Sequence, residues 1–74
     1  MNSTIIKSLI KDIENITGFK VEEYNIKSLD DEHDMWILEV KFNVDLKGIN
    51  KTELSCAIMT KIKYWPMNLD LWIS

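Results

Sequence analysis

The sequence predicts a single α+β domain over residues 1–74, with two amphipathic helices packed on one face of a three-stranded sheet. Two segments carry apolar residues at helical spacing, and three segments alternate apolar with polar residues. Their order along the chain is αββαβ. A chain of 74 residues has room for one domain and no second.

The first expected helix begins near the N-terminus. Its apolar residues share one arc of a helix: Ile5, Ile6, Leu9, Ile10, Ile13 and Ile16. Asn2 or Ser3 can cap its start, and Thr17-Gly18 supplies the glycine that commonly follows a helix end. Because isoleucine has modest helix propensity, we expect burial of this arc to stabilise the helix.

Two strands are expected next, joined by the polar turn 30–34 into a hairpin. The first covers Phe19 to Leu29, and its alternation changes phase at Glu22-Glu23, which indicates a β-bulge. The second runs from Trp36 to Leu46. Its core face is expected to carry Trp36, Leu38, Val40, Phe42, Val44 and Leu46, while Met35, Ile37, Glu39, Lys41, Asn43 and Asp45 face the other way.

The second expected helix starts after Lys47-Gly48, with Asn50 as its cap and Glu53 three residues later. Pro66 stops it. Its buried face is expected to hold Leu54, Ala57, Ile58, Ile62 and Trp65.

The tail 67–74 alternates again and is expected to form the third strand. Leu69, Leu71 and Ile73 take one face, and Asn68, Asp70 and Trp72 take the other. A right-handed crossover through the second helix brings this strand back into the same sheet. It can lie beside either the first or the second strand, and the sequence leaves both orders open.

Composition excludes several functions. The net charge is −3 and all nine basic residues are lysine, so direct nucleic-acid binding is not expected. The chain lacks an apolar run long enough to span a bilayer and a basic, apolar leader at its start, which predicts a soluble, cytoplasmic protein without membrane partners. Cys56 is the single cysteine, so it cannot form an intramolecular disulfide.

Three features of the sequence are candidates for chemical sites. His33, among the carboxylates of the turn 30–34, could serve as a general base, but no nucleophile accompanies it at a matching spacing. The same turn is too short for a calcium loop and lacks its glycine. Cys56 lies on a flank of the second helix without a redox or protease constellation. We therefore expect no catalytic residue, no metal and no cofactor.

One surface is instead expected to bind a partner. By alternation, Met35, Ile37 and Trp72 point away from the helix-covered face, with Asp70 on the same side as Trp72. Exposed apolar patches that include tryptophan often mark interfaces. The alternative is that Trp72 folds over the sheet edge within the monomer.

These features favour a small non-enzymatic module that docks on another protein or protein complex through the open sheet face or edge. Its general character suits a stoichiometric inhibitor or accessory protein, such as a phage anti-defence or immunity protein. A second hypothesis makes the same patch a homodimer seam. A third is a small-molecule binder or enzyme, which needs a polar group inside the core; Tyr24 and Ser28 are the candidates.

Overall fold

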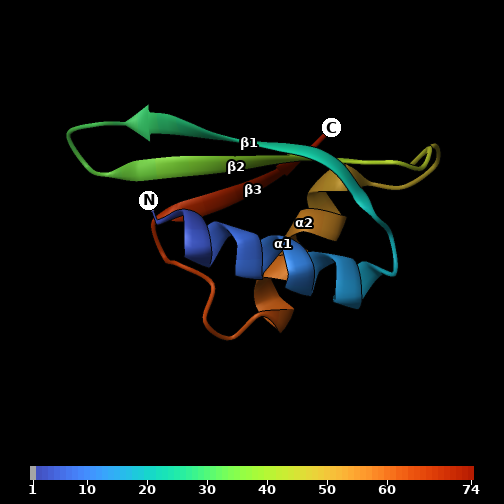
Figure 1. Ribbon diagram of the computed structural model, residues 1–74. Helices are drawn as coiled ribbons and strands as arrows, with labels where there is room; N and C mark the ends of the chain where they lie inside the picture. The colour runs from blue at the N-terminus through green and yellow to red at the C-terminus, as the bar shows by residue number, and fades with distance from the viewer. Residues whose placement is uncertain (1) are drawn as a thin grey trace.

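The computed structural model describes residues 2–74, and within them the expected element order is confirmed. The elements are α1 (Ser3–Thr17), β1 (Val21–Asp30), β2 (Met35–Phe42), α2 (Lys51–Lys61) and β3 (Leu69–Ile73). Figure 1 shows both helices on the same side of the sheet, with α1 and α2 crossing beneath the strands. The fold is thus a two-layer α+β domain with one sheet face left without a helix.

The sheet has the strand order β1-β2-β3, which resolves the alternative that the sequence left open. β1 and β2 form an antiparallel hairpin, whereas β2 and β3 run parallel and are connected through α2. The bulge expected at Glu22-Glu23 is confirmed, because the register shifts between Val21 and Glu23; a second shift lies between Ser28 and Asp30. β2 is therefore the central strand, and β1 and β3 are the two edges.

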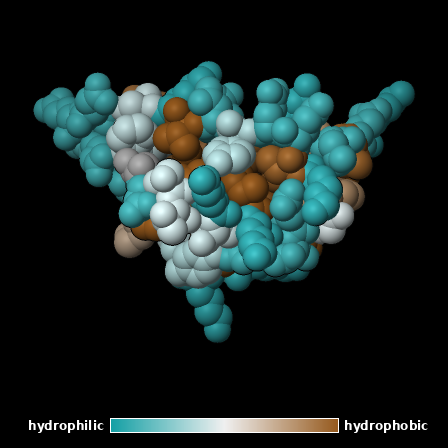
Figure 2. All heavy atoms as spheres, in the orientation of Figure 1, coloured by the Kyte–Doolittle hydropathy of each residue, from teal (hydrophilic) through white to brown (hydrophobic). Residues whose placement is uncertain are grey.

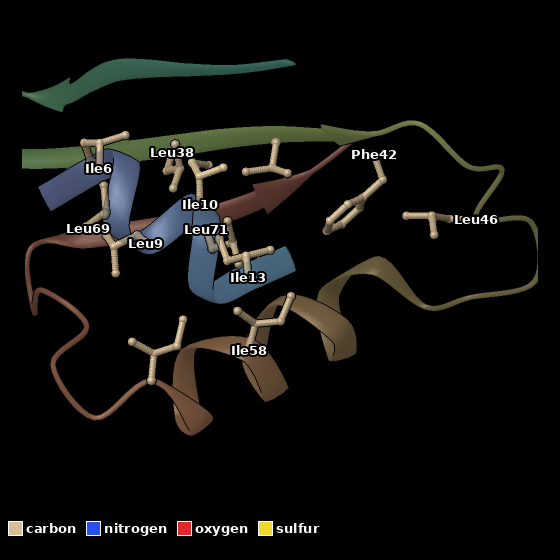
Figure 3. Close-up of a cluster of buried hydrophobic side chains, with 12 residues drawn as sticks. Ile6, Leu9, Ile10, Ile13, Leu38, Phe42, Leu46, Ile58, Leu69 and Leu71 are labelled. Carbon is tan, nitrogen blue, oxygen red and sulfur yellow. The ribbon is translucent and has the colours of Figure 1, made fainter. Parts of the chain in front are cut away.

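The core lies between β2, β3 and the two helices (Figure 3). Leu38 and Val40 of β2 and Leu71 of β3 meet Leu9 and Ile13 of α1 there. The full buried cluster is Ile6, Leu9, Ile10, Ile13, Leu38, Val40, Phe42, Leu46, Ile58, Ile62, Leu69 and Leu71. Burial of this apolar surface is the main contribution that stabilises the helices on the sheet.

The ends of α1 follow the sequence signals. The Asn2 side chain accepts a hydrogen bond from the Thr4 amide at 2.8 Å, so Asn2 rather than Ser3 is the cap. Gly18 ends the helix in the left-handed region at φ 74°, and its amide bonds the Glu14 carbonyl. Ile5 and Ile16, at the margins of the expected apolar arc, are exposed, so the buried stripe is narrower than predicted.

The second strand is shorter than expected. β2 ends at Phe42, and the chain then bends, so that Val44 is exposed rather than on the core face. Leu46 still reaches the core, but from the loop that leads to α2. The alternation of residues 43–46 therefore reflects a turn with one inward side chain and not a continued strand.

The second helix also ends earlier than expected. Asn50 caps α2 by accepting from the Glu53 amide at 3.1 Å, as predicted, but the last helical residue is Lys61. Of the expected buried face, Ala57 is exposed and Trp65 lies beyond the helix, while Ser55 is buried. No helix in the described part of the chain is both long and apolar enough to cross a lipid bilayer.

Candidate functional site

The outer edge of β3 is the first component of the candidate site. The Trp36 amide donates to the Asn68 carbonyl, and the Ser74 amide donates to the Val40 carbonyl. In a parallel ladder these bonds turn the backbone groups of residues 70 and 72 toward β2 as well. The N–H and C=O groups of Leu69, Leu71 and Ile73 consequently point to the free edge of the sheet.

The first half of this edge is already hydrogen-bonded within the chain. The Leu69 amide donates to the Pro66 carbonyl at 3.2 Å, and the Leu69 carbonyl accepts from the Trp65 indole at 2.7 Å. The Leu71 amide donates to Asp70 Oδ1 at 3.1 Å. Local groups therefore prevent another strand from pairing with this half of the edge.

The second half of the edge is open. Among residues 2–74, no group donates to the carbonyls of Leu71 and Ile73 or accepts from the Ile73 amide. Exposed strand edges of this kind bind extended segments of other chains through main-chain hydrogen bonds. Two carbonyls and one amide are thus available for an added strand.

Trp72 lies beside this open half, on the sheet face without helices. Its side chain is 53% exposed, and its indole nitrogen donates to Asp70 Oδ2 at 2.9 Å. The exposure expected for Trp72 is confirmed. The Asp70 carboxylate therefore bonds both the edge amide of Leu71 and the indole of Trp72.

The structure contradicts the predicted exposure of Ile37. It lies on the expected face, outside the helix-side core cluster, but it is only 6% exposed. The register places it in the central strand, between Lys27 of β1 and Asp70 of β3, so it has a neighbouring residue on each side. The prediction of an exposed Ile37 was wrong, because it treated the central strand as uncovered.

Glu39 lies on the same sheet face as Ile37, the face without helices. It pairs with Trp72 in the register, and its Oε1 lies 2.8 Å from the Lys27 Nζ. This oxygen is buried, and the Lys27 ammonium is its charge partner. Met35, at the start of β2, is half-buried and pairs with Asp30 instead of lying next to Trp72. Of the four predicted residues, the structure brings Trp72 and Asp70 together and leaves Ile37 covered.

The helix side of the edge adds residues that the sequence did not single out for binding. A hollow between β3 and α2 is lined on the helix by Lys51, Thr52, Ser55, Cys56 and Met59. The charged residues that line this hollow are Lys51 of α2 and Asp70 of β3. Alternation of β3 alone could not reveal this, since it depends on how α2 lies along the strand.

The acidic turn 30–34 is held together by its own hydrogen bonds. Asp30 Oδ1 accepts from the Glu32 amide, and Asp30 Oδ2 lies 2.6 Å from His33 Nδ1. Asp34 accepts from the indole of Trp36 at 2.6 Å and from the amide of Asn68 at 2.8 Å through its carbonyl. Asp30, Glu32 and His33 offer ligand-type atoms within 4.8 Å of one another at the surface. These contacts hold the turn in place and connect the hairpin to β3, so the turn has a structural role.

The two residues expected to provide polar chemistry inside the core do not do so, because Tyr24 and Ser28 are exposed. Ser55 is the buried polar residue of the described chain, and its hydroxyl donates to the Thr52 carbonyl at 2.9 Å. Cys56 is exposed on α2, as expected. The hypothesis of a small-molecule binder or enzyme is therefore not supported by Tyr24 or Ser28.

Comparison with known proteins identifies no relative. No family model matches the chain, and neither a curated protein nor a solved structure does. The geometry of the β3 edge and of Trp72 is consequently the basis for a functional proposal.

Proposed function

We propose that this chain is a non-enzymatic protein-binding module that docks through the β3 surface, defined as the open edge at Leu71 and Ile73 together with Trp72. The observation that carries the proposal is an exposed tryptophan next to unpaired main-chain groups on an edge strand. Tryptophan supplies a large apolar contact, and the edge supplies directional hydrogen bonds. Together they provide both affinity and register.

The kind of partner follows from charge and from the type of contact. The chain has a net charge of −3 and no arginine, which disfavours a phosphate backbone as the ligand. Unpaired backbone amides and carbonyls are complemented by another polypeptide in extended form. We therefore favour a protein partner, and the chain's small size suits a stoichiometric inhibitor or accessory protein of the cytoplasm, including the phage anti-defence and immunity kinds.

The other strand edge is a poorer docking site. β1 contains two register shifts, and Glu22, Glu23 and Lys27 are exposed along it. Bulges and charged residues are the devices by which proteins prevent strand pairing at an edge. The β3 surface is thus the better candidate of the two.

The test compares two aromatic residues of almost equal exposure. Trp72 is 53% exposed on the β3 surface, whereas Tyr64 is 55% exposed after α2. Affinity-tagged wild type, Trp72→Ala and Tyr64→Ala are incubated with lysate of the producing cell, and the bound proteins are quantified by mass spectrometry. We expect at least one protein whose recovery falls about tenfold or more with Trp72→Ala and is unchanged with Tyr64→Ala.

Circular dichroism and thermal unfolding establish that both variants fold. Equal recovery of every bound protein by wild type and Trp72→Ala would remove Trp72 from the docking surface and overturn the proposal.

A further inference from the structure

We infer that the β3 surface selects an extended segment of a partner protein that carries a basic side chain, arginine above all, opposite Trp72. Asp70 is the residue that recognises the charge of this side chain. The inference rests on the proposed function, since it names the chemistry of the partner that the same surface binds. It is carried by a carboxylate without a cation, held against an exposed tryptophan at the open edge of the sheet.

The Asp70 carboxylate lies at the edge where a partner strand would be added. Its Oδ1 accepts from the Leu71 amide at 3.1 Å, and that amide points away from β2. Its Oδ2 accepts from the indole nitrogen of Trp72 at 2.9 Å, which holds the carboxylate beside the ring. A carboxylate has about four acceptor positions, so this one can accept about two further hydrogen bonds from a partner.

The charge of Asp70 is not compensated within the described chain. In residues 2–74, no basic side-chain nitrogen lies within 4.0 Å of its oxygens. The ion pairs of this part of the chain are Lys27–Glu39, Lys41–Glu22 and His33–Asp30. Glu39 is the register neighbour of Trp72 in β2, and Lys27 balances its charge at 2.8 Å. Asp70 therefore leaves one negative charge beside the indole.

The open main-chain groups determine which partner residue meets this charge. In a parallel strand, the residue opposite Trp72 donates to the Leu71 carbonyl and accepts from the Ile73 amide, both of which are open. The Leu71 amide keeps its bond to Asp70. An antiparallel strand would instead direct a carbonyl at the Leu71 amide, which the carboxylate already occupies. The parallel register thus places one partner side chain next to both Trp72 and Asp70.

The chemistry of that side chain follows from desolvation and from the ring. An added strand removes water from the Asp70 carboxylate, whose two donors are both neutral, so a neutral or acidic residue opposite Trp72 would leave a desolvated charge without a counterion. A guanidinium can donate to the carboxylate and stack on the exposed indole. A lysine can form the ion pair but lacks the planar group. Arginine is therefore favoured over lysine, and both over uncharged residues.

Peptide selection with a charge-matched control tests the inference. Phage-displayed random peptides are selected on wild type, Asp70→Asn, Asp70→Lys and Asp45→Lys. Asp45 is exposed in the loop after β2, and it also accepts from a main-chain amide, that of Lys47 at 2.9 Å. Each Asp→Lys substitution replaces one negative charge by one positive charge and so changes the net charge from −3 to −1. A general preference of an acidic protein for basic peptides would therefore change equally in both lysine variants.

We expect the peptides selected by wild type to carry arginine or lysine at one common position, about tenfold above aspartate or glutamate. Asp45→Lys should retain this preference, Asp70→Asn should lose it, and Asp70→Lys should reverse it toward acidic residues. Circular dichroism checks that each variant folds. Asp70→Asn keeps an oxygen that can accept from the indole, so it tests the role of the charge even where Asp70→Lys does not fold.

Nuclear magnetic resonance then locates the selected peptide. Titration into the labelled chain should shift the Ile73 amide and the Trp72 indole signals. Failure to select any peptide, a selected set without a common basic residue, or a basic preference that Asp70→Lys leaves unchanged would each overturn the inference. The proposed function is judged separately, because the loss of a captured protein with Trp72→Ala does not depend on which residue of the partner meets Asp70.

Discussion

The indole nitrogen of Trp65 donates a hydrogen bond to the carbonyl oxygen of Leu69 at 2.7 Å, four residues along the chain. Trp65 follows α2 and is half-buried against the core. This bond satisfies an edge carbonyl of β3 that has no strand neighbour on its outer side. It also positions the segment that returns from α2 to the sheet.

We predict that Trp65→Phe lowers the free energy of unfolding by about 1 kcal/mol, because the Leu69 carbonyl is left without its donor in a partly buried place. Trp36→Phe is the matched control. The Trp36 indole donates to the exposed Asp34 carboxylate, where water can replace it, so the loss should be smaller. Urea unfolding measures both, and a larger loss for Trp36→Phe would contradict this account.

The central strand provides a second prediction. Leu38 is completely buried in the core, whereas Leu29 at the end of β1 is 57% exposed. We expect Leu38→Ala to reduce the free energy of unfolding by about 3 kcal/mol, because the deletion leaves a cavity at a site packed from all sides. Leu29→Ala should change it by less than about 0.5 kcal/mol. Similar losses for the two variants, measured by chemical denaturation, would show that β2 does not form the centre of the core.

A third prediction concerns the end of α1. Gly18 has φ 74°, a conformation that side chains with a Cβ adopt at a cost, although no atom lies within 4 Å of where that Cβ would be. Gly18→Ala should therefore destabilise the protein by about 1 kcal/mol through backbone strain alone. Gly18→Asn should cost less, since asparagine tolerates the left-handed region. Equal thermal shifts for the two variants would point to another cause.

Local signals in the sequence predicted most of the elements. The alternation of Leu38, Val40 and Phe42 identified the core face of β2, and Asn50 and Gly18 correctly marked helix ends. These features depend on residues close together in the chain, so a single sequence is enough to read them.

Relations between distant segments were not predictable in the same way. The position of β3 next to β2 depends on packing of the whole layer, and so does the burial of Ile37 between the two neighbouring strands. The bond from Asn68 to the Asp34 carbonyl joins residues 34 positions apart. For the candidate site, alternation predicted that Trp72 points outward. The hollow lined by Lys51, and the hydrogen bonds that occupy half of the β3 edge, could be identified only from the tertiary structure.

The two register shifts in β1 have a consequence for aggregation. Open-ended fibrils grow when both outer strands of a sheet offer straight, unpaired edges, so that each added chain presents a new template. Here β1 is interrupted twice, and the Leu69 end of β3 is occupied by Trp65 and Pro66. Only a short stretch of edge at Leu71 and Ile73 is left open, so the sheet lacks the two straight edges that fibril growth requires, and we expect the chain to form no amyloid.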